Sequence, residues 1–158
     1  MDRPLRLIRG AAFCSSFDRM AIAPMLVAIS DDLGESLAAV TFTATLYFLL
    51  YGAMQPVWGM LSDQVGRVRV MRLTLFGATL AGVISALAPN LGVLVAARAL
   101  AGGLFAAVIP AALVYVGDTV GMDSRQKALA DLMAASAVGT VAVWHRRRFH
   151  TPARRALC

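Results

Sequence analysis

The stretch GMLSDQVGRVR, residues 59–69, is a short charged connection between two long apolar segments. Residues 37–61 lead into it and residues 70–88 follow it, and each can cross about 30 Å of hydrocarbon at ~1.5 Å per residue. Three further apolar segments complete the chain: 7–30, 91–116 and the shorter 128–144. The pattern predicts an all-α, polytopic membrane protein with four to five transmembrane helices.

The composition supports a lipid-embedded chain. Of 158 residues, 59% are hydrophobic and only 15% are charged, which is too little polar surface for a soluble domain of this size. The net charge of +6 does not indicate a nucleic-acid binder, because no basic face interleaved with aromatic residues runs along any helix. Five arginines are instead gathered near the C-terminus, at positions 146, 147, 148, 154 and 155.

Residue types that support catalysis or metal binding do not form a recognisable pattern. Cys14 lies inside an apolar segment and Cys158 is the last residue, so these two cysteines do not indicate a disulfide framework. His145 and His150 lie in the arginine-rich tail without partners at ligand spacing. With no phosphate-binding loop and no nucleophile–base arrangement, we expect no enzyme activity, no cofactor and no metal site.

The basic residues predict the orientation in the membrane. They fall before the first segment, around residues 67–72 and after the fourth segment, whereas the connections 31–36 and 89–90 contain none. The residues concerned are Arg3, Arg6, Arg9, Arg67, Arg69, Arg72, Arg125 and Lys127. Because cytoplasmic loops carry the excess of Lys and Arg, we expect an inner-membrane protein with a cytoplasmic N-terminus and an uncleaved first helix.

The connection at 59–69 resembles the signature between helices 2 and 3 of the major facilitator superfamily. Gly59, Asp63, Gly66 and Arg67 match that signature. Gln64 replaces its usual basic residue, Val68 replaces its second arginine, and Arg69 follows one position late. We expect Gly59 to permit close helix approach, Gly66 to support a tight turn, and Asp63 to bond nearby arginines.

The fourth segment contains Arg98 followed four residues later by Gly102, which resembles the helix-4 motif of the same family. Ala101 departs from the glutamine often found there. An arginine this deep in a span costs roughly 2.5–3.5 kcal/mol on insertion scales, so we expect it to face the bundle interior and to have a partner. Gly102 and Ala106 offer a small-residue face for close packing.

The first segment contains Asp18 and Arg19, then Pro24 and an Asp-Leu-Gly ending at Gly34, and resembles the first helix of drug/proton antiporter-like members. At ~1.5 Å per residue, Asp18 and Arg98 lie within roughly 10 Å of the same depth. We therefore predict that Asp18, Arg19 and Arg98 belong to the transport pathway, with Asp18 paired to Arg98 as a candidate proton carrier. In the alternative interpretation, Asp18 pairs only with Arg19 and is structural.

Tyr47, Tyr51 and Trp58 fall on roughly one face of the second segment, with Gln55 nearby. These side chains are candidates for a substrate-lining surface, although such a stripe more often packs helices together or forms an interfacial belt.

The resemblance implies a partial N-terminal transmembrane domain over residues 1–144, from a transporter built of two six-helix halves. It implies secondary active transport of a small organic solute, such as proton-coupled drug efflux, although the Gly-Pro step of the antiporter helix 5 is missing. We expect residues 145–158 to form a disordered or out-of-frame basic tail on a truncated chain. Activity would then require the missing C-terminal half or self-association in the lipid bilayer. The alternatives are an inert remnant, a small self-assembling transporter, or a membrane interaction module.

Overall fold

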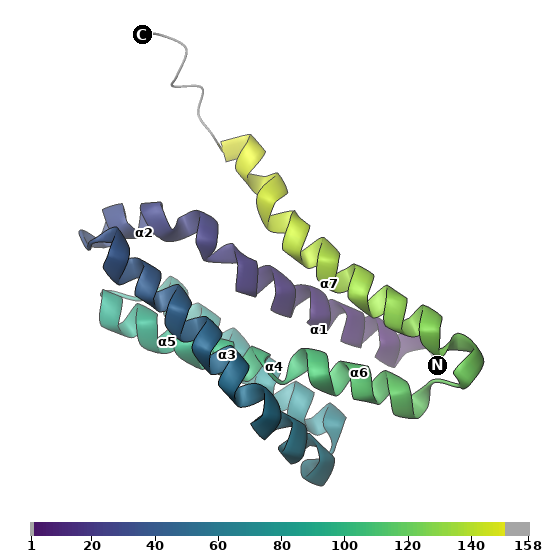
Figure 1. Cartoon of the computed structure of the whole chain (residues 1–158). Coiled ribbons are helices and arrows are strands. Elements are labelled where there is room, and N and C mark those ends of the chain that lie inside the picture. Colours follow the sequence, from purple (N-terminus) through teal and green to yellow (C-terminus); the bar gives the residue numbers. More distant parts are fainter. Residues whose placement is uncertain (1, 151–158) are drawn as a thin grey trace.

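The computed structural model describes the backbone of residues 2–150 and the side chains of residues 4–143. The described chain is a bundle of helices that run roughly side by side (Figure 1). In chain order the elements are α1 (Asp2–Ala21), η1 (Ala23–Met25), α2 (Leu26–Leu33), α3 (Leu37–Val65), α4 (Arg67–Ala86), α5 (Leu91–Phe105), α6 (Val108–Thr119) and α7 (Met122–His150).

Four of these helical stretches are long and apolar enough to cross a membrane: Pro4–Leu33, Leu37–Val65, Arg67–Ala86 and Leu91–Thr119. The predicted fold class is thereby confirmed. The fifth expected segment, 128–144, lies inside α7, which continues as a helix to His150. Six residues of the expected tail are therefore helical, and residues 151–158 lie outside the described part of the chain.

Short polar connections start and stop the helices. Ser36 caps α3 by accepting a hydrogen bond from the amide of Ala39 at 3.2 Å. Asn90 caps α5 in the same way, by accepting from the amide of Val93 at 3.0 Å. Gly66, at φ +101°, separates α3 from α4 in a conformation that L side chains rarely adopt, so the predicted glycine turn is present.

Two of the four spans are interrupted within their length. The first passes from α1 through the single 3-10 turn of η1 to α2, and Pro24 lies in that turn. The fourth is interrupted between Phe105 and Val108, and Ala106 in this break lies four residues before Pro110. Proline lacks an amide hydrogen and its ring clashes with the carbonyl of residue i−4, so both breaks have a local cause.

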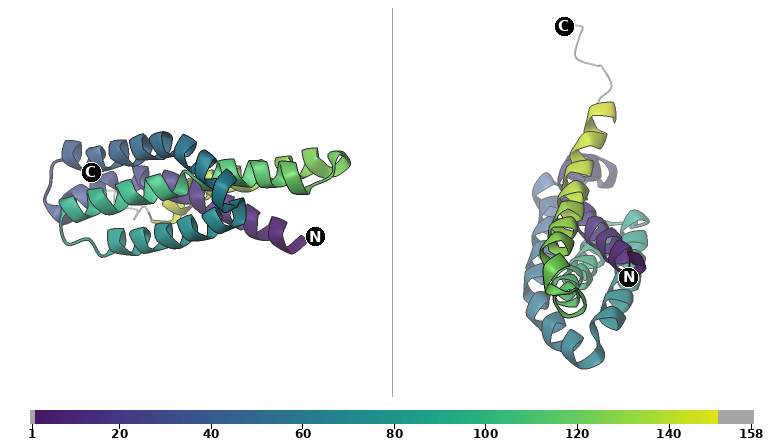
Figure 2. Two further views of the ribbon diagram at one scale, coloured as in Figure 1. Left: turned by 90° about the horizontal axis from the view of Figure 1, so that it is seen from below. Right: turned by 90° about the vertical axis from the view of Figure 1, so that its right-hand side faces the viewer.

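The span formed by α5 and α6 lies at the centre of the bundle. In its most apolar window 61% of the residues are buried, against 22% for each of the first two spans. Helices α3 and α4 both pack along α5, while α1 packs chiefly along α7 (Figure 2). The central span is therefore the one from which a side chain can reach several neighbouring helices.

Glycines allow the closest approaches between helices, at Gly102 as the sequence predicts but not at Gly59. A Cβ built on Gly59 would meet nothing within 4 Å, so the expected close approach at Gly59 is absent among the described residues. A Cβ on Gly102 would lie 2.4 Å from the carbonyl oxygen of Tyr47, and one on Gly139 would lie 2.4 Å from that of Phe13. The tight α3–α5 and α1–α7 contacts therefore depend on Gly102 and Gly139.

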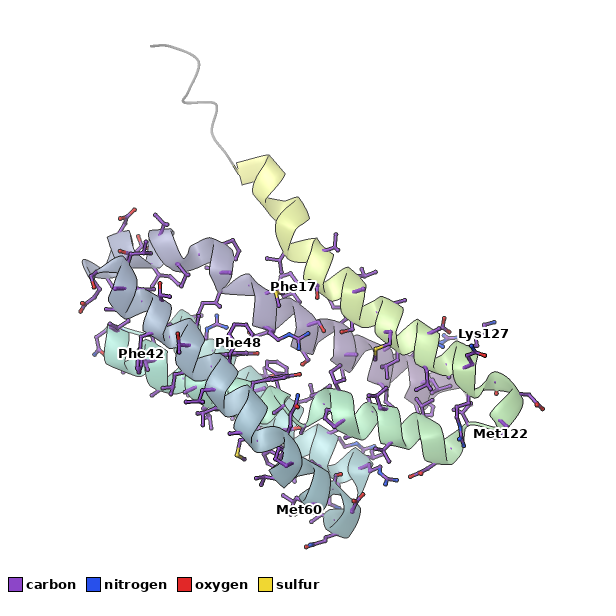
Figure 3. The ribbon with its side chains drawn as sticks, viewed as in Figure 1. Phe17, Phe42, Phe48, Met60, Met122 and Lys127 are labelled. Atoms are coloured by element: carbon purple, nitrogen blue, oxygen red, sulfur yellow. The ribbon has the colours of Figure 1, made fainter. Side chains whose placement is uncertain are left out.

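Large apolar side chains cover the outside of the bundle, as a lipid-facing surface requires. Phe42, Phe48 and Met60 lie along α3 and are 56%, 45% and 63% exposed (Figure 3). On a soluble protein such residues would promote aggregation, whereas in a bilayer they face hydrocarbon.

Candidate functional site

Asp18 and Arg98 form a direct ion pair inside the bundle. Asp18 lies near the end of α1 and Arg98 in the middle of α5, and Asp18 Oδ1 is 3.0 Å from Arg98 Nη1. Both side chains are well covered, at 22% and 15% exposure respectively. The second carboxylate oxygen of Asp18 accepts a hydrogen bond from the Tyr47 hydroxyl at 3.1 Å. The predicted contact between Asp18 and Arg98 is thus present.

Arg19 turns away from Asp18 and toward the aromatic face of α3. Its Nη1 donates to the Tyr51 hydroxyl at 3.3 Å, and its guanidinium carbon lies 5.3 Å from the centroid of the Tyr51 ring. Tyr47 and Tyr51 stack with their ring centroids 6.4 Å apart. The alternative in which Asp18 pairs only with Arg19 is therefore not the arrangement found.

The position of the pair within broken helices is informative. Asp18 lies just before the break between α1 and α2, and Arg98 lies on the span that breaks between α5 and α6. Discontinuous helices near the membrane midplane are where transporters of several folds hold substrates and coupling ions. Within these spans, the Asp18 carboxylate is held between the guanidinium of Arg98 and the phenol of Tyr47.

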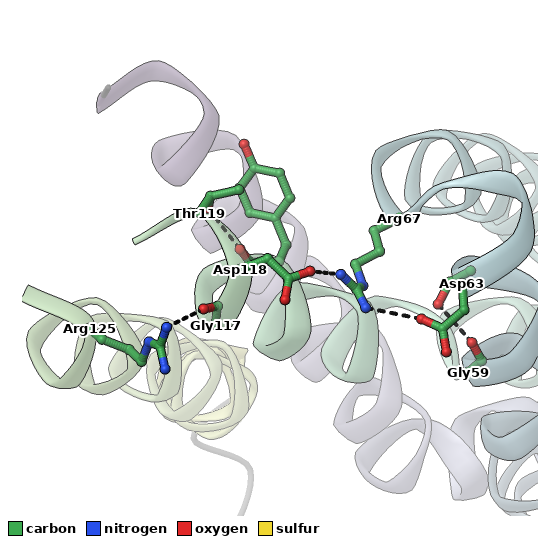
Figure 4. Close-up of polar contacts among 9 residues, drawn as sticks. Gly59, Asp63, Arg67, Gly117, Asp118, Thr119 and Arg125 are labelled. Carbon is green, nitrogen blue, oxygen red and sulfur yellow. Dashed lines mark hydrogen bonds and ion pairs between the residues drawn. The ribbon is translucent and has the colours of Figure 1, made fainter. Parts of the chain in front are cut away.

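A second charged network lies where α3, α4 and α6 meet at the end of the bundle that holds the N-terminus. Arg67 Nη2 is 3.0 Å from Asp63 Oδ1, and Arg67 Nη1 pairs with Asp118 on α6 (Figure 4). Next to this network, Arg125 donates to the carbonyl oxygen of Gly117. The sequence identifies Asp63 and Arg67 but not Asp118 as the second partner of Arg67, because nothing local links positions so far apart.

Helices α1 and α7 are joined by two polar contacts that the sequence analysis missed. Arg9 Nη2 lies 2.6 Å from Asp131 Oδ2, and the hydroxyl oxygens of Ser16 and Ser136 lie 2.5 Å apart. The orientation signal places Arg9 and Asp131 at the same end of the bundle, so a pairing between these opposite charges was in principle detectable.

The remaining candidate residues have less specific surroundings. Tyr47 and Tyr51 are 0% and 7% exposed and belong to the apolar core, as the packing alternative predicts. Trp58 donates to the carbonyl oxygen of Gly103 at 2.6 Å, which ties α3 to α5. Gln55 is partly buried and Arg69 is exposed.

The described residues contain no group of three or more His, Cys, Asp or Glu side chains that could hold a metal ion. Cys14 is exposed. Cys158 lies outside the described residues, as do the side chains of His145 and His150.

Comparison with known proteins agrees with this architecture. The family model of the Major Facilitator Superfamily matches residues 10–143. The chain is 33% identical over 150 residues to a triacylglyceride transporter of Mycolicibacterium hassiacum, an alignment that covers 88% of this chain and 28% of that protein. It is 30% identical over 134 residues to a triacylglyceride transporter of Mycolicibacterium smegmatis, with 83% and 24% covered.

A third relative comes from a different organism. The chain is 30% identical over 115 residues to the efflux pump dotC of Dothistroma septosporum, with 73% of this chain and 20% of that protein covered. The chain therefore spans about a quarter of the length of the curated relatives it matches. Since the family model matches most of the chain and the predicted multi-pass architecture is present, the chain belongs to the Major Facilitator Superfamily.

Proposed function

We propose that this chain forms part of a proton-coupled secondary transporter for a small organic solute, in which Asp18 carries the proton and Arg98 is its counter-ion. The observation that carries the proposal is the 3.0 Å contact between these two side chains within the membrane-spanning part of the bundle. Ionisable side chains at such depths are expensive to keep there, and they commonly mark ion pathways.

Protonation of Asp18 would change the forces between two broken spans. The charged carboxylate attracts Arg98 and accepts the hydrogen bond from Tyr47, which holds α1 against α5 and α3. A neutral carboxyl group loses the ionic attraction and leaves Arg98 without a counter-charge. Relative movement of the spans at their breaks is the response that we expect to couple proton uptake to transport.

We propose that the protein lies in the inner membrane and that its N-terminus is in the cytoplasm. The network of Asp63, Arg67 and Asp118 lies at the N-terminal end of the bundle, and α1 and α7 place Arg9 and Asp131 at that end too. Because the positively charged ends of membrane helices favour the cytoplasmic side, this end is the cytoplasmic one.

The names of the relatives support a proposal for the solute class. Two relatives are named for triacylglyceride transport and one for efflux, so we propose export of an apolar or amphipathic organic molecule. The remaining walls of the pathway would come from a C-terminal half or from further copies of the chain. We propose Tyr51, which contacts Arg19, and Gln55, which is partly buried on the same helix, as lining residues.

Proton movement in proteoliposomes tests this proposal. The purified chain would be reconstituted in vesicles that contain the pH indicator pyranine, and gradients of ethidium or tributyrin would be imposed as probes. We expect a probe-driven change of internal pH with the wild-type chain and its loss in Asp18→Asn. The matched control is Asp123→Asn, since Asp123 is an exposed carboxylate at the start of α7. Proton movement that is present in the wild type and equally large in Asp18→Asn would contradict the assignment of Asp18.

The mass of the chain in mild detergent separates the alternatives. A defined multimer that moves protons would favour a self-assembling transporter. A monomer that moves no protons would favour one of two alternatives. Either the chain acts only together with the polypeptide that completes the pathway, or it is an inert remnant.

A further inference from the structure

A cavity of about 400 Å³ lies between α1 and the first part of α7, at the end of the bundle that holds the N-terminus. Its walls come from these two helices and from the connection between α6 and α7. The volume falls within the range of about 300–1,000 Å³ that is typical of small-molecule pockets. The cavity is separate from the contact between Asp18 and Arg98, since neither residue lines it.

The polar side chains of the lining are accessible, and not all of them are paired. Lys127 lies on α7 near the turn that precedes this helix (Figure 3), is exposed, and takes part in no ion pair or hydrogen bond among the described residues. Arg9 pairs with Asp131 through Nη2, and both side chains are 38% exposed. Nη1 of Arg9 has no partner within the described chain. A ligand in the cavity can therefore reach an unpaired ammonium group and one edge of a guanidinium group.

The charge of the lining is positive by one unpaired cation. Lys127 and Arg9 are its basic residues, and the charge of Arg9 is balanced by Asp131. Outside the lining, Arg6 and Asp123 are exposed and offset each other. Lys127 is thus left without a counter-charge in the cavity, and an anion bound beside it meets net attraction.

The cavity lies at the level expected for lipid head groups. The first membrane-spanning stretch begins at Pro4 and the fourth ends at Thr119. Leu5 and Val120, which both line the cavity, are therefore each one residue from the end of such a stretch. With Ala128 they give the cavity an apolar side next to its charged side. Basic cavities between helices at this level suit the phosphate groups of anionic lipids.

We propose that this cavity binds the head group of an anionic phospholipid, with the phosphate oxygens between Lys127 of α7 and Arg9 of α1. Ser124, also in the lining, can donate its hydroxyl to the same phosphate, because its hydrogen bond to the Gly121 carbonyl oxygen is long, at 3.4 Å. The glycerol part of the lipid contacts Leu5, and the acyl chains extend into the surrounding bilayer. Since the phosphate contacts both α1 and α7, the bound lipid stabilises the packing of these two helices.

A membrane lipid suits this cavity better than a soluble phosphate compound. The uncompensated charge is that of Lys127, whose side chain is exposed. Water and salt screen the attraction between one exposed ammonium group and a soluble anion, so such an anion binds weakly. A lipid is already held at this level by its acyl chains, and the apolar side of the cavity adds contacts that a small soluble phosphate does not make.

Native mass spectrometry of the full chain, released from detergent micelles, tests the site by measuring the binding of single lipid molecules. The probes are anionic phosphatidylglycerol, phosphatidylcholine, which has a phosphodiester but no net charge, and soluble glycerol 3-phosphate. We expect phosphatidylglycerol to bind about fivefold more tightly than phosphatidylcholine, which is the effect of one basic side chain near the membrane surface. We expect glycerol 3-phosphate not to displace phosphatidylglycerol.

Variants make the test specific. Lys127 is exposed and unpaired among the described residues, so Lys127→Gln retains the fold, and the preference for phosphatidylglycerol should disappear. The matched control is Arg69→Gln, which removes a positive charge from an exposed position on α4 outside the cavity and should keep the preference. Asp131→Asn removes the carboxylate that opposes the phosphate and releases Arg9, so it should increase the preference.

Three results would overturn the proposal. The first is equal affinity of the wild-type chain for phosphatidylglycerol and phosphatidylcholine. The second is an equal effect of Lys127→Gln and Arg69→Gln, which would indicate a general attraction to basic residues and no specific site. The third is displacement of phosphatidylglycerol by glycerol 3-phosphate, which would indicate a soluble phosphate ligand. None of these results concerns proton movement through Asp18, so this site and the proposed function can fail independently.

Discussion

Gly102 of α5 lies directly against the backbone of Tyr47 on α3. A Cβ at position 102 would be 2.4 Å from the Tyr47 carbonyl oxygen and 3.0 Å from Cγ of its ring. Tyr47 is completely buried and donates its hydroxyl hydrogen bond to Asp18. The absence of a side chain at position 102 therefore sets the distance between α3 and α5 and, through Tyr47, the surroundings of the charged pair.

Gly102→Ala is expected to destabilise the chain, because the atom that the Cβ meets is backbone and cannot rotate away. Overpacking of this kind costs about 1–3 kcal/mol. The measurement is unfolding in mixed micelles by titration with dodecyl sulfate, followed by circular dichroism. Gly52→Ala is the control, since a Cβ there meets nothing within 4 Å and the change favours helix by up to ~1 kcal/mol. Equal stability of the two variants would contradict the close approach.

The ion pair predicts a strong coupling between Asp18 and Arg98. Asp18→Asn leaves Arg98 without a counter-charge, while Arg98→Gln leaves Asp18 with the hydrogen bond from Tyr47. We therefore expect Asp18→Asn to be the more destabilising single change. Unfolding of both single variants and the double variant should give a coupling energy of roughly 1–3 kcal/mol.

The control for this cycle is Asp123→Asn combined with Arg98→Gln, because Asp123 is exposed and lies at the start of α7. That pair should be additive within about 0.5 kcal/mol. Additivity of Asp18→Asn and Arg98→Gln would mean that their contact contributes nothing to folding in the bilayer mimetic.

The spans and the central pair could be predicted from the sequence for simple physical reasons. Long apolar runs have few alternatives to crossing a bilayer, and the depth of a residue along a span follows from helical rise. That arithmetic is sufficient to place Asp18 and Arg98 at similar depths. It also predicts the turn at Gly66, whose positive φ is a local property of the chain.

Contacts between helices could not be predicted in the same way. Gly59 and Gly102 look equivalent as small residues within apolar spans, yet only Gly102 faces another backbone at close range. Rotation of each helix about its axis decides which one is used, and the low amphipathicity of lipid-facing helices leaves this rotation unspecified by sequence pattern. The pairing of Arg67 with Asp118 depends on the same unknown rotation.

The contact between α1 and α7 is predicted to depend on Gly139. A Cβ at this position would lie 2.4 Å from the Phe13 carbonyl oxygen, and the Ser16–Ser136 hydrogen bond lies one turn away. Gly139→Ala should therefore lower stability by about 1–3 kcal/mol and should increase hydrogen exchange in α7. Gly117→Ala is the control, because a Cβ there has open space around it. Unchanged exchange in Gly139→Ala would show that α7 is not held by this contact.

The network around Arg67 is predicted to contribute little stability despite its two ion pairs. The Asp63 and Asp118 side chains are 66% and 52% exposed, so solvent and salt screen both interactions. Arg67→Gln should cost about 1 kcal/mol or less at low salt, and the difference should shrink at 1 M salt. Arg69→Gln, on the same helix and exposed, is the control. A large loss that persists at high salt would contradict the screened geometry.

The proposed orientation is tested by labelling the two ends of the bundle. Gln64 lies beside the Arg67 network, whereas Glu35 lies in the connection between α2 and α3, and both side chains are exposed. In a chain with Cys14→Ser and Cys158→Ser, we expect Gln64→Cys to react with a membrane-impermeant maleimide only in inside-out vesicles. Glu35→Cys should react only in right-side-out vesicles, because in the proposed orientation the other end, with its excess of Lys and Arg, is cytoplasmic. The reverse pattern would place the N-terminus outside.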